Sequence, residues 1–333
     1  MTALEIGINI NEQFEVPVLL CIFNRPEKIK RVLSELLKIQ PKYLFIAADG
    51  PRPGNTSDVL NTTLARNAIN GINWDCEIKT LYQEKNLGCR RGMTAAIDWF
   101  FENVESGIIL EDDCIPQKSF FEYAQELLTK YQDDQRVMSI GAQHFHGTAH
   151  QINESYFFSR YVHCWGWATW RRAWSKHDQE MVCWKQLRNS NWLLEIGCGS
   201  RLFKKYWENI FDRCDSGEID SWAYRWTLSC WSQSGLTILP SKNLVTNIGF
   251  DNQATHTSRG NLVTENLPLE EIEFPLKHPS IICADYAADM WTAKHVFDIN
   301  YQSFIKQLVI SMPGGKILQI LVQKIKILMG KKW

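Results

Sequence analysis

The strongest constraint on the fold is an alternation, in the first third of the chain, of short apolar runs with stretches of helical periodicity. The apolar runs predict four strands, at 16–23, 43–48, 77–82 and 107–110. Helices are predicted between them, over Glu27–Leu37 and Met93–Phe101. Strands and helices in this order form a mostly parallel sheet, and such sheets bind ligands beyond the carboxyl ends of their strands. We therefore expect an α/β, Rossmann-like fold.

Length and charge narrow the class of partner. The chain has 333 residues, 45% of them hydrophobic, which is enough to bury a sizeable core. Its formal net charge is −1, so it lacks the excess of Lys and Arg by which proteins bind nucleic acid. A small or locally recognised substrate is expected, and no nucleic acid.

The cysteines and the N-terminus bear on the compartment. Ten cysteines lie singly, without the paired spacing typical of zinc sites, and we interpret them as reduced, packed thiols. The first residues are polar and acidic and lack the pattern of a signal peptide. We expect a cytoplasmic protein, with a disulfide framework as the less favoured alternative.

The character of the chain changes beyond residue 140, where ten of the fourteen tryptophans fall between Trp165 and Trp231. Only two further strands are predicted, at Thr237–Leu239 and Leu244–Asn247. We expect one domain over 14–260, with a nucleotide-binding half (14–140) and an acceptor half (141–260), followed by a helical C-terminal extension (261–333).

The extension ends in Lys316–Trp333, which mixes lysines with regularly spaced aliphatic residues. A basic amphipathic helix of this kind can lie on a membrane surface, which would place the protein at the inner face of the cell membrane. Packing on the domain, or on a second subunit in a homodimer, is an equally good interpretation.

Three acids follow the predicted strand at 107–110, namely Glu111, Asp112 and Asp113. Carboxylates at the end of a buried strand are costly unless a cation or hydrogen bonds compensate them. A divalent ion, Mn²⁺ or Mg²⁺, would link these acids to a diphosphate. The alternative is a solvated acidic turn.

Two further groups of residues suggest ligand contacts. Arg90 and Arg91 stand at the start of a predicted helix, where guanidinium and backbone N–H groups can both bind phosphate, although such pairs are as often surface residues. Trp165, Gly166 and Trp167 place aromatic rings around a glycine, which predicts a platform for sugars. Burial in the core is the alternative for these tryptophans.

The acidic triplet, followed by Phe120-Phe121-Glu122-Tyr123, resembles the metal-motif region of N-acetylglucosaminyltransferase I and related GT-A glycosyltransferases, and Asn24-Arg25-Pro26 fits that family too. The resemblance implies a GT-A fold and a nucleotide-sugar donor, for which the family prefers uridine. It assigns the donor site to Asn24, Arg25, Asp49, Glu111 and Asp112. It assigns the metal to Asp113, with His256 as a late histidine ligand.

A second motif of this family resembles Glu218-Ile219-Asp220-Ser221-Trp222. The resemblance makes Asp220 the catalytic base that takes a proton from the acceptor hydroxyl in an inverting displacement, with Glu218 as the nearest rival and Trp222 on the acceptor side. The alternative for Asp220 is an N-cap of the helix that follows.

The predicted function is therefore metal-dependent transfer of a hexosyl or N-acetylhexosaminyl group from a nucleotide sugar to a glycan or lipid-linked acceptor. A sugar nucleotidylyltransferase is one alternative, but those enzymes usually carry a glycine-rich basic loop after the first strand, where this chain has Asn24-Arg25-Pro26-Glu27. A carbohydrate-binding or inactive transferase-like protein and a glycoside hydrolase are the others.

Overall fold

The computed structural model describes residues 13–250, 264 and 267–301. The strands in these ranges are β1 (Val18–Ile22), β2 (Tyr43–Ala48), β3 (Glu77–Tyr82), β4 (Ser106–Glu111), β5 (Cys114–Pro116), β6 (Val137–Gly141), β7 (Tyr156–Ser159), β8 (Trp167–Trp170), β9 (Leu236–Pro240) and β10 (Val245–Asn247). The helices are α1 (Pro26–Ile39), α2 (Thr56–Asn67), α3 (Gly88–Asn103), α4 (Lys118–Lys130), α5 (Arg171–Trp174), α6 (Val182–Leu187), α7 (Trp192–Ile196), α8 (Arg201–Asp215), α9 (Trp222–Ser232) and α10 (Tyr286–His295).

Within the described ranges the central sheet has eight strands in the order β3-β2-β1-β4-β8-β6-β9-β7. The first four run parallel, so the carboxyl ends of β1, β2 and β4 meet at one edge. Strand β8 runs antiparallel between β4 and β6. The expected α/β class, with a mostly parallel, Rossmann-like sheet flanked by helices, is confirmed. A small second sheet pairs β5 with β10.

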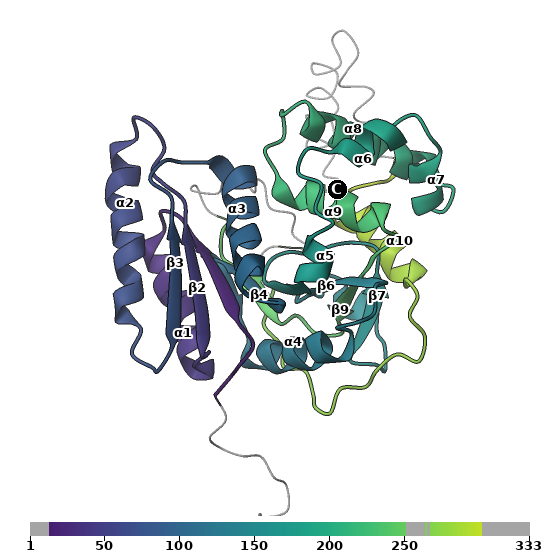
Figure 1. Cartoon of the computed structure of the whole chain (residues 1–333). Coiled ribbons are helices and arrows are strands. Elements are labelled where there is room, and N and C mark those ends of the chain that lie inside the picture. Colours follow the sequence, from purple (N-terminus) through teal and green to yellow (C-terminus); the bar gives the residue numbers. More distant parts are fainter. Residues whose placement is uncertain (1–12, 251–263, 265–266, 302–333) are drawn as a thin grey trace, which may run out of the picture.

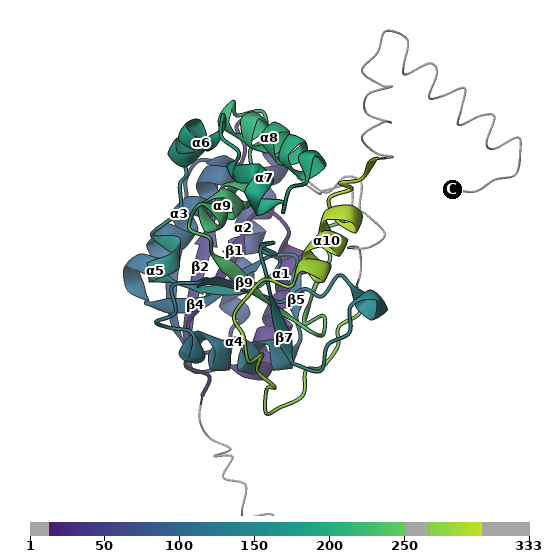
Figure 2. The same cartoon turned by 90° about the vertical axis from the view of Figure 1, so that its right-hand side faces the viewer.

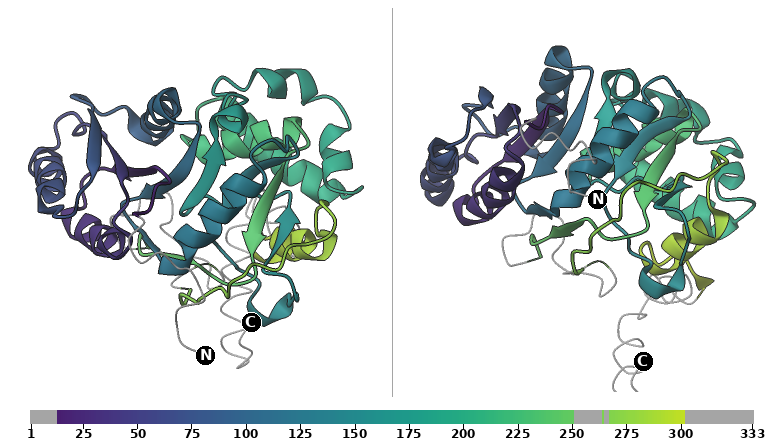
Figure 3. Two further views of the ribbon diagram at one scale, coloured as in Figure 1. Left: turned by 60° about the horizontal axis from the view of Figure 1, so that its bottom comes forward. Right: turned by 90° about the horizontal axis from the view of Figure 1, so that it is seen from below.

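Helices cover the sheet on both sides. In Figure 1, β1 to β3 lie with α1 and α2 on the left, and α6 to α9 lie at the upper right beyond α3. Seen from below, α4 crosses the middle of the sheet (Figure 3). Helix α10 packs beside β7 (Figure 2). No helix among the described residues is long and apolar enough to cross a membrane.

The sequence explains the elements that carry the site. Helix α1 begins with a proline and buries Ile29, Val32, Leu33 and Leu36, a spacing that turns one face to the sheet. Strands β1 and β4 are buried along nearly their whole length, as strands covered by helices on both faces must be. The predicted helix at Met93–Phe101 begins earlier, at Gly88, so its N-terminus lies directly after the loop that follows β3.

The second half of the chain contains strands that the sequence did not indicate. Strand β8 is buried at every position and supplies tryptophans to the core instead of forming a loop. A second aromatic core, with Trp184, Trp207 and Trp231, lies beneath α6 to α8. All ten cysteines are free thiols, and four of them are buried, Cys21, Cys114, Cys214 and Cys230.

Candidate active site

A cavity of about 360 Å³ opens at the carboxyl edge of the parallel strands. Its walls come from the ends of β1 to β4, from the first turns of α3 and from the segment before α9. Seven of the predicted site residues lie on its wall or contact groups that do, namely Arg25, Asp49, Arg90, Glu111, Asp112, Asp113 and Asp220. The fold thus assembles residues that are nearly 200 positions apart in the chain.

The acidic triplet follows β4 and faces the loop after β1. The backbone N–H of Phe23 donates to Asp112 Oδ2 at 3.0 Å. Arg25 Nη1 donates to Asp112 Oδ1 at 3.1 Å and to Asp113 Oδ2 at 2.7 Å. One guanidinium therefore bridges two neighbouring carboxylates, both of them largely shielded from solvent. The solvated acidic turn considered as an alternative does not describe this arrangement.

The charge at this end of the cavity is only partly compensated. Burial, followed by repulsion from Asp113 and Asp112, raises the pKa of Glu111, and burial and repulsion from Asp113 also raise the pKa of Asp112. Arg25 acts in the opposite direction on both groups. Excess negative charge of this kind favours binding of a further cation.

Asp113 is held from its other side by the small sheet. Ile248 donates its backbone N–H to the Asp113 carbonyl at 2.8 Å, next to the pairing of Asn247 with Cys114. The Asp113 carboxylate lies directly against Gly249, where a Cβ atom would overlap it and would stand 2.8 Å from Asn247 Oδ1. Glycine at 249 therefore leaves the space that the Asp113 carboxylate occupies.

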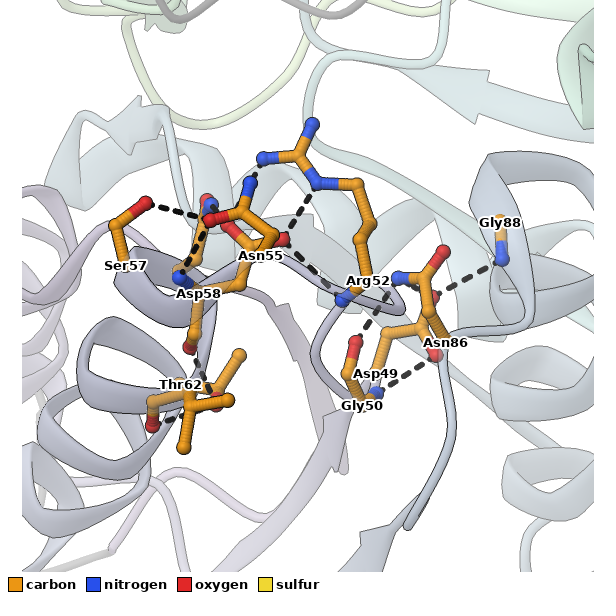
Figure 4. A network of polar contacts seen from close by, with 11 residues as sticks. Asp49, Gly50, Arg52, Asn55, Ser57, Asp58, Thr62, Asn86 and Gly88 are labelled. Atoms are coloured by element: carbon orange, nitrogen blue, oxygen red, sulfur yellow. Dashed lines mark hydrogen bonds and ion pairs between the residues drawn. The ribbon is translucent and has the colours of Figure 1, made fainter.

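Asp49 ties the end of β2 to the start of α3, as Figure 4 shows. Its carboxylate accepts hydrogen bonds from Asn86 Nδ2 at 3.0 Å, from Leu87 N at 2.9 Å and from Gly88 N at 3.2 Å. Burial raises the pKa of Asp49, against the lowering effect of these hydrogen bonds. A carboxylate at a helix N-terminus is a stable arrangement, and here it fixes one wall of the cavity.

Asp220 reaches the cavity from the segment before α9. Arg90 Nε lies 3.4 Å from Asp220 Oδ1, and the Asp220 side chain is 50% exposed. The interpretation of Asp220 as the helix N-cap is wrong, because Ser221 caps α9 by accepting a hydrogen bond from Tyr224 N. Its carboxylate therefore stays available for contact with a ligand.

Several predicted site residues point elsewhere. Asn24 is not among the residues that line the cavity, and its amide donates to Asp58 Oδ1 at 2.7 Å. Arg91 is exposed and does not line the cavity. Glu218 is 60% exposed, outside the cavity lining and paired with Arg213. It therefore lacks the position at the cavity that a rival base would need.

The tryptophan platform needs correction. Trp167 is 1% exposed and Trp222 is 3% exposed, and their rings stack on each other 5.7 Å apart. They therefore belong to the core and present no free face to a sugar. Gly166 has φ +72°, and a Cβ there would lie 2.9 Å from a methyl group of Val245, so its role is close backbone packing. Trp165 is only partly buried and contacts the ring of Phe250.

The residues fit a cation that arrives together with a diphosphate better than they fit a preformed metal cage. Carboxylate oxygens suit Mn²⁺ and Mg²⁺, and Mg²⁺ is commonly bound by one or two carboxylates plus substrate phosphates. In the described part of the chain, no group of three His, Cys, Asp or Glu side chains is arranged to hold an ion. His256, the predicted second ligand, lies outside the described residues.

Sequence reasoning missed three residues of the site, Arg52, Asp58 and Gly249. Arg52 lines the cavity and Asp58 holds it in place. A signal for Arg52 was present, because it stands only three positions after Asp49, just beyond the end of a predicted strand. Gly249 also gave a signal, because it stands two positions after the predicted strand at Leu244–Asn247, although its contact with Asp113 was not foreseen. Asp58 gave none, since its role depends on its contacts in the folded chain.

No protein family and no curated protein matches this chain in sequence. Among solved structures it is similar to a cytidylyltransferase from Leptospira borgpetersenii serovar Hardjo-bovis, with 11% identity, a TM-score of 0.31 and coverage of 50% of this chain and 64% of that chain. It is also similar to mouse xyloside xylosyltransferase 1, with 11% identity, a TM-score of 0.33 and coverage of 64% and 80% respectively.

A mannose-1-phosphate geranyltransferase from Thermus thermophilus is 9% identical, with a TM-score of 0.33 and coverage of 67% of this chain and 73% of that chain. The chain spans less than two thirds of the cytidylyltransferase's length. Similarities at this level carry no argument about activity, which depends on the site itself.

Proposed function

We propose that this protein is a glycosyltransferase that uses a nucleoside-diphosphate sugar, with Asp220 as the base. One observation carries the proposal: a single cavity at the carboxyl edge of a parallel sheet is lined by Arg25 and Asp112, with Asp113 bound to the same guanidinium, and by a separate, half-exposed carboxylate, Asp220. The first set suits a diphosphate with its cation, and the second suits an incoming hydroxyl group. UDP is the preferred donor only through the family resemblance.

The chemistry would be a single displacement. Asp220 takes the proton of an acceptor hydroxyl group while its oxygen forms a bond to the anomeric carbon of the donor. The bond from that carbon to the diphosphate oxygen breaks, and the diphosphate leaves with the electron pair. Arg25 and Arg90 are placed to hold phosphate oxygens and to stabilise the charge that develops on them. Mn²⁺ or Mg²⁺, bound by Asp113 and the diphosphate, would supply further charge neutralisation.

The acceptor belongs to the same proposal. A glycan or a lipid-linked sugar would enter on the side of Asp220, between α3 and α9. Contact with a membrane through Lys316–Trp333 remains a prediction, because this segment lies outside the described residues. A homodimer also remains a prediction.

The proposal is tested by measuring UDP release from a panel of UDP-sugars with Mn²⁺ present. We expect Asp220→Asn to lower turnover about a hundredfold or more, the usual contribution of a general base, while its UDP affinity stays unchanged. Glu218→Gln tests the rival base. We expect its turnover to stay unchanged, because the carboxylate that it removes lies outside the cavity lining. Loss of turnover in Glu218→Gln but not in Asp220→Asn would contradict the assignment of the base.

Two further measurements distinguish the alternative functions. Formation of a nucleotide sugar from a nucleoside triphosphate and a sugar 1-phosphate would identify a nucleotidylyltransferase. Binding of oligosaccharides without binding of any nucleotide would identify a carbohydrate-binding protein.

A further inference from the structure

A buried carboxylate beside the cavity holds an arginine in one orientation. Asp58, near the start of α2, has a side chain that is 1% exposed. Its Oδ2 accepts a hydrogen bond from Arg52 Nε at 2.5 Å and its Oδ1 accepts one from Arg52 Nη2 at 2.8 Å. The backbone N–H of Arg52 and the amide of Asn24 donate to the same carboxylate, at 3.2 Å and 2.7 Å. Figure 4 shows this network.

This network places the guanidinium group at the cavity. Arg52 and Phe23 both line the cavity, and Arg52 Cζ lies 5.5 Å from the centroid of the Phe23 ring. A guanidinium has five N–H donors, and the fork to Asp58 uses two of them, which leaves three without a partner among the described residues. The side chain is 53% exposed, so these donors can be reached by a ligand.

The charge of Arg52 is already neutralised. The hydrogen bonds from Arg52 lower the pKa of Asp58 to about 2, so the pair is fully ionised at neutral pH and carries no net charge. Arg52 differs from Arg25 in its surroundings, because Arg25 contacts Asp112 and Asp113, where the cation and the diphosphate are proposed, whereas Arg52 contacts Asp58 and the ring of Phe23. Remaining N–H donors beside an aromatic ring suit a flat, neutral group that carries hydrogen-bond acceptors.

We propose that Arg52, oriented by Asp58, is a specificity-determining residue that donates hydrogen bonds to a carbonyl oxygen of the donor's nucleobase. The inference rests on the proposed function and adds the group that reads the base. A guanidinium can only donate hydrogen bonds, so it suits the carbonyl oxygens of uracil. Adenine carries an amino group in place of the uracil O4 and offers only ring nitrogens as acceptors, so it fits this donor less well.

The test is a calorimetric comparison of UMP, AMP and pyrophosphate, each with Mn²⁺, on the full-length protein and on Arg52→Lys and Asp58→Asn. We expect each substitution to weaken UMP binding about tenfold, as the loss of one or two hydrogen bonds implies, and to narrow the preference for UMP over AMP. Pyrophosphate affinity should stay within about twofold, because neither residue contacts phosphate. Arg136→Lys is the matched control, since Arg136 forms a similar fork to Asp134 on the surface.

The outcomes separate the two proposals. If Arg52→Lys weakens pyrophosphate as much as UMP, then Arg52 binds phosphate and this inference is wrong, while the proposed function stands. UMP binding that is unchanged in Arg52→Lys also overturns the inference. A wild-type protein that binds neither UMP nor pyrophosphate overturns the proposed function itself. If Asp58→Asn fails to fold, the comparison of wild type with Arg52→Lys alone decides the test.

Discussion

At the scale of single residues, the site depends on how closely the chain packs around Asp113. This carboxylate is held between the guanidinium of Arg25 and the backbone of Gly249. Asn247 is the last residue of β10, and its side-chain amide donates toward Asp113 Oδ1. Its Oδ1 accepts a hydrogen bond from the backbone N–H of Gly249. The position of the predicted metal ligand is therefore determined by a segment more than 130 residues away in the chain.

Gly249→Ala tests this packing. The added methyl group would overlap Asp113 and displace its carboxylate, so we expect Mn²⁺-dependent UDP affinity to fall about tenfold. Titration calorimetry of UDP with Mn²⁺ measures the effect. Gly71→Ala is the control, because no atom lies within 4 Å of a Cβ built there. Equal affinities in wild type and Gly249→Ala would show that Asp113 does not need its present position.

Asp58→Asn gives a prediction about pH. The pKa of Asp58 is about 2 in the folded protein, below its ordinary value of 3.8. A lowered pKa stabilises the fold above pH 4, and this stabilisation is lost as the pH falls toward 2. We expect wild type to exceed Asp58→Asn in free energy of unfolding by on the order of 1–2 kcal/mol at pH 7, with the difference shrinking between pH 4 and pH 2.

Urea unfolding of both proteins at pH 7, 4 and 3 measures this difference. A difference that stays constant over that range would mean that ionisation of Asp58 contributes nothing to stability. It would then argue against the ion pair with Asp58 as the contact that orients Arg52.

At the scale of elements, the start of α9 links stability to the candidate base. Ser221 caps this helix, and Asp220 precedes the cap directly. Loss of a serine cap costs about 1 kcal/mol of stability and frays the first turn. Because Asp220 is attached to that turn, fraying should also displace its carboxylate.

Ser221→Ala should therefore lose about 1 kcal/mol of stability and about tenfold in turnover, because small displacements of a catalytic group are costly. Ser200→Ala removes the equivalent cap of α8, which lies outside the cavity lining. We expect the same loss of stability there with unchanged turnover. Thermal unfolding and UDP release measure both quantities. A similar loss of turnover in both variants would show a general effect of destabilisation.

The elements also show where sequence reasoning succeeds. The four strands of the first half and helix α1 were predicted to within a few residues, and helix α3 was predicted except for its start, whereas helix α2 was not predicted. Strand β8 was missed because its sequence, Trp-Ala-Thr-Trp, suggests a cluster of rings as readily as a strand. Its place between β4 and β6 depends on pairing between distant segments, which periodicity does not report.

At the scale of the whole molecule, the acidic triplet and Asp220 were found from short motifs, and the fold brings Glu111, Asp112 and Asp220 to one cavity, with Asp113 held against Arg25 beside it. What the sequence could not supply is which side chains turn inward. Trp167 and Trp222 were predicted as ligand contacts and are core residues, whereas Arg52 was not predicted and lines the cavity. Whether a side chain points into the core or into the cavity is decided by packing against elements far away in the chain.

The central claim is that this cavity binds a nucleoside diphosphate through Asp113 and a divalent cation. The most direct measurement is a calorimetric titration of the wild-type protein and Asp113→Ala with UDP, each with and without Mn²⁺. The account predicts UDP binding that Mn²⁺ strengthens in wild type and that Asp113→Ala largely abolishes. Failure of the wild type to bind UDP, GDP, CDP or dTDP under either condition would contradict it.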